Sequence, residues 1–445
     1  MRYILAVVSI LFISKLGFST PKDTTGTMPK KDVRISLNSD GSHYLKFTGL
    51  GQYWLRYTDM NPGSRIYNTP TSSYTDMGLR RLRFQAFGQI NKYAFFYVQF
   101  GLNNFTFRSP HYLGAFFHDA LGEFKVKDEK LSLGAGLTSW AGLSRYSAPS
   151  AGKIMSLDAP LYQQATSGLN DQFIRRFTIY AKGQISKLDY RVGVSFPFAA
   201  QVSPVKLPTL SVNTSTFSGL PPKPQANGYI KYQVFEHENN TGPFGVGTYL
   251  GSKKILAFGF GYTIQEDAIS ELELNGDTSY HAMIHLAGDV FLDLPINKEK
   301  GTALTWYASY HYLDYGKNFM LNGGVMNLAT GVNGPGTING GGNAFPMRGT
   351  GSTFYTQIGY VFGNSIISDD GRLQPYAASQ VSQFEALAEP MVMVESGLNW
   401  FITGDHSSKL SANVQQRPIF VFDSNGDGVV SHYRGMVQLQ LQVGF

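Results

Sequence analysis

Apolar and polar residues alternate with a period of two along much of this chain. The clearest case is 437–445, which reads Val-Gln-Leu-Gln-Leu-Gln-Val-Gly-Phe. In an extended strand, successive side chains point to opposite faces, so this segment has one apolar face and one glutamine-lined face. The pattern predicts a strand whose two faces contact different surroundings.

The same alternation predicts sixteen strands. They cover 44–58, 79–90, 93–102, 115–126, 131–138, 172–185, 188–196, 226–236, 254–265, 280–292, 303–312, 353–362, 373–384, 392–402, 409–420 and 433–445. In the strand 254–265, for example, Leu256, Phe258, Phe260 and Tyr262 share one face. An even number of strands puts both chain ends on the same side of a barrel, as in bacterial outer-membrane barrels.

The predicted connections alternate in length. Short turns are expected at Asn91, Asp128, Ser186 and Asn297, and long loops at 59–78, 139–171, 197–225 and 315–350. Short turns on one side and long loops on the other are typical of outer-membrane barrels. The glycine-rich loop 315–350 is predicted to be a mobile outer loop. The segment 237–254 is the one that this pattern does not assign.

The composition indicates that the predicted strands cross a membrane. The chain has no run of about 18 apolar residues, so a transmembrane helix is not expected. A protein without such helices can cross lipid only as a closed barrel. Aromatic residues make up 14% and charged residues 15% of the chain, and the mean hydropathy is −0.15. We therefore predict an all-β fold, a transmembrane antiparallel β-barrel of about sixteen strands with long extracellular loops.

The amino terminus predicts export. Residues 1–19 combine Arg2 with an apolar stretch and a small-residue cleavage site, which is typical of a signal peptide. We expect 20–42 to be a periplasmic extension and 43–445 to be the barrel. The absence of cysteine excludes a lipoprotein signal, disulfides and thiol chemistry.

The carboxyl terminus and the charge define the expected partners. A strand that ends on Phe445 resembles the tag read by the barrel assembly machinery, and the outward face is expected to contact outer-membrane lipid. The formal net charge is +6, and two of the positive charges, Arg2 and Lys15, lie in the predicted leader. This modest excess does not indicate a nucleic-acid partner.

Several strand-and-turn phrases carry a family resemblance. They are Phe116-Phe117-His118-Asp119-Ala120, 130–137, Ser144-Arg145, Leu157-Asp158-Ala159-Pro160 and 248–254. In these the chain resembles porins of the Bacteroidetes, distant relatives of the phosphate-selective porin O and P family. The resemblance implies a sixteen-stranded, often homotrimeric, passive channel. It also implies a third outer loop that folds into the pore, here 139–171.

Basic residues on the inward face are the candidate chemistry of such a channel. The candidates for an anion path are Arg56, Arg81, Arg83, Arg145, Arg176, Lys182, Arg191 and Lys231. Guanidinium groups bind phosphate and carboxylate in a bidentate manner, so a row of them would favour anions. In the alternative interpretation they only balance inward acids such as Asp119, Glu123, Asp189, Asp289 and Glu395. Arg80 and Arg175 have outward parity and are expected at the outer rim.

Metal and catalytic chemistry have weaker signals. Asp423, Asn425 and Asp427 resemble the start of a calcium loop, but position twelve is Arg434 and the same residues form turns well. His281, His285 and His311 alternate inward on neighbouring strands, where solvated histidines are the commoner interpretation. We expect no cofactor. Helical zinc motifs, nucleophile elbows and phosphate-binding loops are not found in the sequence.

The sequence favours a porin in the bacterial outer membrane over its rivals. It would allow passive diffusion of small hydrophilic solutes, with a mild preference for anions such as phosphate, and would not be an enzyme. The first alternative is a structural or secretion-associated barrel with a plugged lumen, which an apolar lumen would support. A hydrolase embedded in a barrel is less favoured because no nucleophile and base pair stands out.

Overall fold

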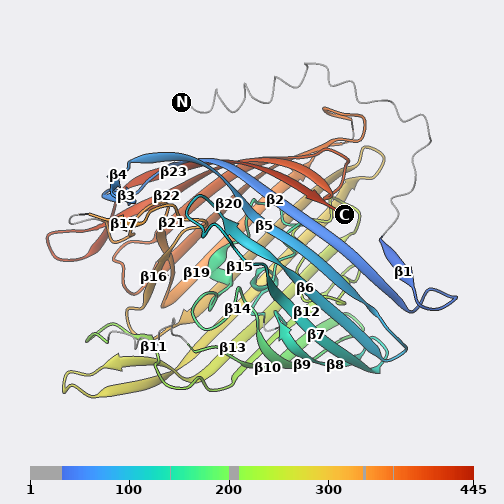
Figure 1. The fold of residues 1–445 in the computed structure, drawn as a ribbon, viewed down its shortest axis with the longest axis horizontal. Helices are drawn as coiled ribbons and strands as arrows, with labels where there is room; N and C mark the ends of the chain where they lie inside the picture. Colours follow the sequence, from blue (N-terminus) through green and yellow to red (C-terminus); the bar gives the residue numbers. More distant parts are fainter. Residues whose placement is uncertain (1–32, 141, 200–209, 334–336, 364) are drawn as a thin grey trace.

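The computed structural model describes residues 33–140, 142–199, 210–333, 337–363 and 365–445. The predicted leader, 1–19, and residues 20–32 of the predicted extension lie outside the described residues. The rest forms a closed barrel of sixteen antiparallel strands, as the alternation predicted (Figure 1). No helix in the described ranges is long and apolar enough to cross a membrane.

The barrel strands correspond one to one with the predicted strands. They are β2 (Tyr44–Asp59), β5 (Ser73–Gln89), β6 (Ala94–Phe105), β7 (Phe116–Lys127), β8 (Leu131–Thr138), β9 (Arg176–Ile185), β10 (Leu188–Phe196), β12 (Gln225–Gln233), β13 (Ile255–Leu272), β14 (Thr278–Asn297), β15 (Thr302–Asp314), β19 (Gly351–Val361), β20 (Arg372–Phe384), β21 (Met391–Phe401), β22 (Ser408–Phe422) and β23 (Gly428–Gly444). Each strand pairs with the next along the chain. Turn residues between alternating runs explain why these boundaries were predictable.

The first and last barrel strands close the cylinder. β2 pairs antiparallel with β23 from Leu50 opposite Gly444 to Thr58 opposite Met436. Beyond this register, the backbone amides and carbonyls of Gly49 and Phe445 exchange two hydrogen bonds of 3.1 Å. A Cβ at residue 49 would lie 2.3 Å from the Phe445 ring, so a larger residue there would require that ring to move. The closed seam leaves no open strand edge at β2 or β23.

The two ends of the barrel differ. Figure 1 shows β1 (Arg34–Ser36) and the carboxyl terminus at one end, which we call the inner end. The short strands β3 (Ser64–Ile66), β4 (Thr69–Pro70) and β17 (Gly331–Val332) lie at the other, outer end. β11 (Thr216–Phe217) extends the sheet beside β13.

The described residues of the outer loop 315–350 carry short strands and buried side chains, and the predicted mobility of this loop stays a prediction. Within its described part, β16 (Met320–Gly323) pairs with β18 (Phe345–Gly349), and every residue of β18 is buried. Asn61 Nδ2 donates to Ala344 O at 2.6 Å and ties this loop to the β2–β3 connection. The glycines shape turns here, and the backbone hydrogen bonds are satisfied by neighbouring loops.

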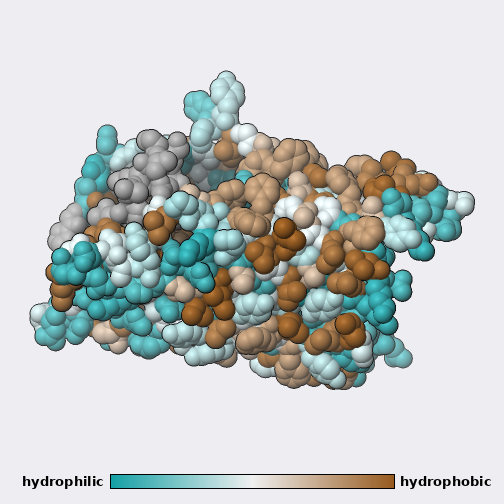
Figure 2. Space-filling view, turned by 90° about the horizontal axis from the view of Figure 1, so that it is seen from below, coloured by the Kyte–Doolittle hydropathy of each residue, from teal (hydrophilic) through white to brown (hydrophobic). Residues whose placement is uncertain are grey.

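The outward face of the barrel is apolar. Exposed outward side chains include Phe96, Phe100, Phe117, Phe124, Phe177, Ile179, Phe258, Phe260, Phe354, Ile358, Leu441 and Val443. Figure 2 shows hydrophobic residues over the middle of the wall and hydrophilic residues gathered toward one end. On β13, Phe258 is 52% exposed whereas the adjacent Ala257 is 2% exposed, so the predicted alternation is confirmed. A wall of this kind matches lipid outside and a polar lumen inside.

Candidate solute path through the barrel

The connection between β8 and β9, residues 139–175, lies inside the barrel, and we call it the outer insert. Its apolar side chains join inward residues of β13, β14, β15 and β19 in one buried cluster. The cluster contains Leu143, Tyr146, Ile154, Ala159, Tyr162, Ala165, Phe217, Ile255, Ala257, Ala268, Ile269, Met283, Ala287, Phe291, Tyr307, Leu313, Tyr315, Phe319, Tyr355 and Ala378. This half of the lumen is therefore filled by a hydrophobic core that holds the insert against the wall.

A glycine on β13 permits this close packing. A Cβ at Gly261 would lie 1.9 Å from Leu143 O, which is far inside van der Waals contact. The inward face of β13 therefore needs glycine at this position so that the insert backbone can rest on the strand.

The connection between β12 and β13, residues 234–254, enters the lumen from the inner end, and we call it the inner insert. It meets the outer insert through backbone hydrogen bonds: Gly245 N donates to Ala148 O at 2.7 Å, and Gly247 N donates to Lys153 O at 3.0 Å. Short inner turns were predicted, and this long connection departs from that pattern. Alternation does not signal it because the segment forms no strand in the barrel wall.

Two carboxylates on β14 anchor the two inserts. Asp289 accepts hydrogen bonds from the Arg145 backbone amide at 2.8 Å and from the Tyr229 hydroxyl. Asp293 accepts from the Tyr249 amide at 2.8 Å and from the Gly251 amide at 3.2 Å. The two acids are four residues apart on one strand, so they share the inward face and hold the inserts at successive depths.

An ion triad joins the inserts across their contact. Glu238 of the inner insert binds Arg145 of the outer insert at 2.6 Å and Lys231 of β12 at 2.9 Å. Burial favours the neutral carboxyl, but the two cations outweigh this effect and hold the pKa of Glu238 well below its usual range. The triad is a buried network of opposite charges, and removing one member would leave the others without a counter-charge.

The predicted basic residues all lie inside the barrel, on the inward face of its strands or on the outer insert. Their acidic partners are Asp76 for Arg56, Asp158 for Arg81, Glu238 for Arg145, Asp171 for Arg176, Glu123 for Lys182, Asp189 for Arg191, and Glu238 and Asp189 for Lys231. Arg83 differs, because its guanidinium donates to Leu82 O, Leu102 O and Asn103 Oδ1. Of the eight candidates, Arg83 is the one for which no ion pair with a described acidic residue is found.

Arg80 and Arg175 point inward, so the prediction of outward side chains at the rim is wrong. In the β2–β5 pairing, Gln52 is opposite Arg81 and Tyr53 is opposite Leu79, which leaves Arg80 in a β-bulge. The extra residue turns the Arg80 side chain into the lumen. Arg175 precedes β9 and donates to Asp119 Oδ2 at 3.0 Å.

Asp158 of the outer insert links two of these arginines. Arg80 Nε donates to Asp158 Oδ2 at 2.8 Å, and Arg81 donates to Asp158 Oδ1. Burial alone would raise the pKa of Asp158, but the two guanidinium groups hold it below its usual value. A carboxylate therefore occupies the Arg80–Arg81 pair in this structure, and it belongs to the protein itself.

A cavity of about 110 Å³ lies beside these groups, and we call it the arginine cavity. Its polar lining comes mainly from β5 and β6, and one side is the 149–152 backbone of the outer insert. The lining residues include Arg80, Arg81, Arg83, Gln85, Gln99, Asn103, Gln164, Arg175 and Phe244. The space corresponds to roughly three or four water molecules, enough for a small oxyanion.

A second cavity of about 390 Å³, the inner cavity, lies between the β5–β9 wall and the inner insert. Its lining includes Gln89, Phe95, Glu123, Lys182, Gln184 and Glu238. An aromatic cluster borders both cavities: it contains Phe95, Tyr97, Trp140 and Tyr180, with Phe87 and Phe244 packed against them. Phe244, from the inner insert, also lines the arginine cavity, so its ring lies at the partition between the two spaces.

The structure describes the positions of the candidate metal ligands but does not bring them together into one site. Asp423 Oδ1 accepts from the amides of Asn425 and Asp427, both at 2.8 Å, and so organises the β22–β23 turn. His285 and His311 are buried in the lumen, whereas His281 is exposed near the outer end. The described residues contain no group of three or more metal-binding side chains close enough to hold an ion.

Sequence reasoning missed several residues that shape the path. Asp158, Trp140 and Phe244 were not among the candidates, and Arg80 and Arg175 were placed on the wrong face. The signals for Asp158 were its place in the predicted pore loop and in the phrase Leu157-Asp158-Ala159-Pro160. Phe244 lay in the segment that alternation left unassigned.

The fold has counterparts among solved structures. The chain is similar to OprB of Pseudomonas putida, with 11% identity, a TM-score of 0.52 and coverage of 90% of this chain and 94% of that one. It is also similar to OmpF of Salmonella typhi, with 12% identity, a TM-score of 0.50 and coverage of 92% and 99%. Identities this low establish the fold alone, which is that of an outer-membrane porin barrel.

No protein-family model and no curated protein matches the sequence. The predicted kinship with Bacteroidetes porins and with the phosphate-selective family therefore stays a prediction. The closed wall and its apolar exterior nevertheless suit a lipid environment, as the alternation predicted.

Proposed function

We propose that this protein is an outer-membrane channel through which small hydrophilic solutes diffuse passively, with a mild preference for anions. The observation that carries the proposal is the arginine cavity, where four guanidinium groups meet two carboxylates. Arg80 and Arg81 both pair with Asp158, and Arg175 pairs with Asp119. Arg83 adds a further positive charge to the lining. A wet cavity with excess positive charge lowers the barrier to a small anion.

The proposed path follows the β5–β9 wall. It passes from the outer end to the arginine cavity, then past the aromatic cluster to the inner cavity, which contains both acids and bases. The outer insert is packed against the opposite wall, and its residues 149–152 form one side of the arginine cavity and so narrow the path. Phosphate and small carboxylates are the anions whose geometry suits guanidinium pairs. No cofactor and no catalytic step is part of the proposal.

One observation favours a second candidate, a sealed structural barrel. The apolar cluster inside the lumen and the direct contact of the two inserts fill much of the cross-section. A plugged barrel would use the inserts as a permanent core. The two candidates differ in a single measurable property, which is ion conductance.

The test is conductance of the full-length protein in planar bilayers, with reversal potentials measured across a KCl gradient. We expect steady channel openings and a reversal potential that is shifted from zero toward the equilibrium potential of chloride. Arg83→Gln should reduce the chloride-to-potassium permeability ratio by about threefold, because it removes a positive charge that forms no ion pair among the described residues. Arg108→Gln, an exposed loop variant, is the matched control. Absence of conductance would support the sealed barrel, and a cation-selective potential would reject the anion preference.

Assembly and partners extend the same proposal. We expect insertion by the barrel assembly machinery through the Phe445 terminus and a homotrimer in the membrane. Native gel migration of unheated protein, compared with a Phe445→Ala variant, measures both the oligomer and the yield of inserted barrel. A monomeric band from a fully inserted preparation would reject the trimer.

A further inference from the structure

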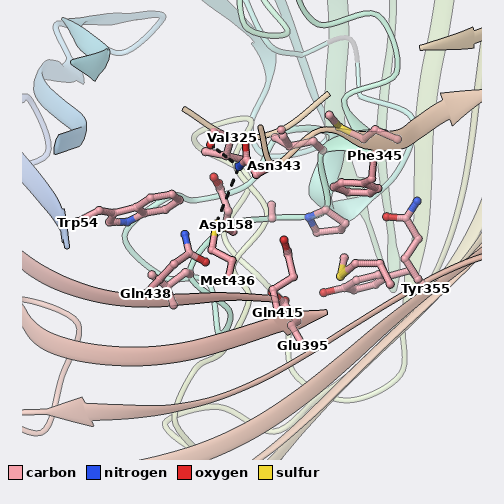
Figure 3. Close-up of a pocket in the computed structure, with 18 residues that line it drawn as sticks. Trp54, Asp158, Val325, Asn343, Phe345, Tyr355, Glu395, Gln415, Met436 and Gln438 are labelled. Atoms are coloured by element: carbon pink, nitrogen blue, oxygen red, sulfur yellow. Dashed lines mark hydrogen bonds between the residues drawn. The ribbon is translucent and has the colours of Figure 1, made fainter. Parts of the chain in front are cut away.

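A third cavity lies near the outer end, and its chemistry is opposite to that of the arginine cavity. This outer cavity of about 60 Å³ lies between three parts of the chain: strands β2 and β19–β23, residues 157–161 of the outer insert, and the folded outer loop. Figure 3 shows Trp54, Glu395, Gln415, Met436 and Gln438 reaching in from the strands, with Phe345 above them.

The charged side chains of this cavity are acidic. Asp158 and Glu395 line it, and its lining contains no lysine, arginine or histidine. The negative charge of Asp158 is already paired, because its two carboxylate oxygens accept hydrogen bonds from Arg80 and Arg81, which line the arginine cavity. Its acceptor capacity is therefore largely used.

Glu395 is different. Its carboxylate forms no ion pair with any described residue, and its single described hydrogen bond, from Asn413 Nδ2, is long at 3.4 Å. Asn413 makes a shorter bond to the Tyr376 hydroxyl, at 2.8 Å. A half-buried carboxylate with one weak partner keeps most of its acceptor capacity, and it faces a cavity without a counter-charge.

The remaining lining suits a cation with a short apolar part. Amide side chains from Gln380, Gln415 and Gln438 offer further oxygen acceptors. Around them lie Phe345, Met347, Tyr355, Met393 and Met436, all of which are buried. Aromatic faces attract cations, and thioethers adapt to short alkyl groups. The volume corresponds to about two water molecules, the size of an ammonium group with one or two carbons.

We propose that the outer cavity binds the ammonium group of a small alkylammonium solute, with Glu395 as its counter-ion. The glutamine amides accept its remaining N–H bonds, and the methionine and phenylalanine side chains contact the alkyl part. This site does not depend on conduction, because binding at the outer end needs no passage through the barrel.

Isothermal titration of full-length protein in detergent with ethylammonium chloride at pH 7.5 tests the proposal. We expect saturable binding, and Glu395→Gln should weaken it at least tenfold without changing the side-chain volume. Glu299→Gln in the exposed β14–β15 turn is the matched control and should bind as the parent does. Gln415→Glu adds a further carboxylate to the lining of the same cavity and should tighten binding.

Three results would overturn the proposal. They are no saturable heat with the parent protein, equal affinity in Glu395→Gln, and equal binding of uncharged ethanol, which would indicate an apolar pocket only. Because Gln415→Glu is expected to gain affinity, a misfolded variant cannot imitate success. Bilayer conductance is measured separately, so a failed titration in a conducting barrel leaves the channel proposal intact.

Discussion

The two sides of the lumen differ in the side chains that they present and in how tightly they are packed. The side formed by β13, β14, β15 and β19 presents apolar and aromatic residues such as Phe291 and Tyr307, and most of it is packed against the outer insert. The side formed by β5 to β9 presents charged and amide residues and borders both the arginine and the inner cavities. One side anchors the outer insert, and the proposed solute path follows the other side. In the proposed channel, a narrowing element is held by one wall while solutes pass along the opposite wall.

Gly261→Val attacks the anchoring side directly and should have the largest effect. The added carbon atoms would collide with Leu143 O, so the outer insert must leave its wall. We expect single-channel conductance to rise several-fold. Gly122→Val on the outward face of β7, where a Cβ meets no atom within 4 Å, is the control. Unchanged conductance in Gly261→Val would mean that the insert does not limit the path.

Glu238→Gln removes the shared anion of the ion triad and should have the next largest effect. Arg145 and Lys231 would keep buried charges without this partner, at a cost of about 3 kcal/mol in the free energy of unfolding. We expect a lower denaturant midpoint and noisier, larger currents. A stability equal to that of the parent would show that the triad does not hold the inserts together.

Phe244→Ala tests the partition on the path side. Loss of the ring should connect the arginine and inner cavities and raise conductance by about twofold. Phe422→Ala, which alters a residue that is 69% exposed at the outer end, serves as the comparison. If both variants conduct like the parent, the path does not pass Phe244.

Acid should produce the smallest effect, through Asp158. Its folded-state pKa lies below the ordinary 3.8, so its ion pairs with Arg80 and Arg81 stabilise the insert above that value. This stabilisation is lost as the pH falls through the lowered pKa. We expect conductance and anion preference to increase modestly below pH 3.8. Asp158→Asn should already show the acid behaviour at neutral pH, and an identical acid step in both proteins would contradict this assignment.

The sequence was sufficient for the barrel wall because the wall depends on local alternation. All sixteen strands and faces such as that of β13 follow from side chains that alternate between lipid and lumen. The side of Arg80 was not predictable, since a bulge shifts parity without any change in local composition. Arg175 lies just before its strand, where alternation does not apply.

The contents of the lumen were least predictable. Which carboxylate meets which guanidinium depends on inserts from distant parts of the chain, as with Arg145 and Glu238, which are 93 residues apart. The inward face of β14 looked merely polar in the sequence. Only the folded inserts show that Asp289 and Asp293 are anchors. Long-range packing of this kind leaves no periodic trace.

The β2–β23 seam has a consequence for biogenesis. It joins the first barrel strand to the last, so it cannot form until the whole polypeptide has been delivered. The two inserts that fill the interior come from the middle of the chain and are already present by then. Closure of the seam therefore comes after delivery of both inserts, and a bulky residue at Gly49 should leave an open, protease-sensitive intermediate.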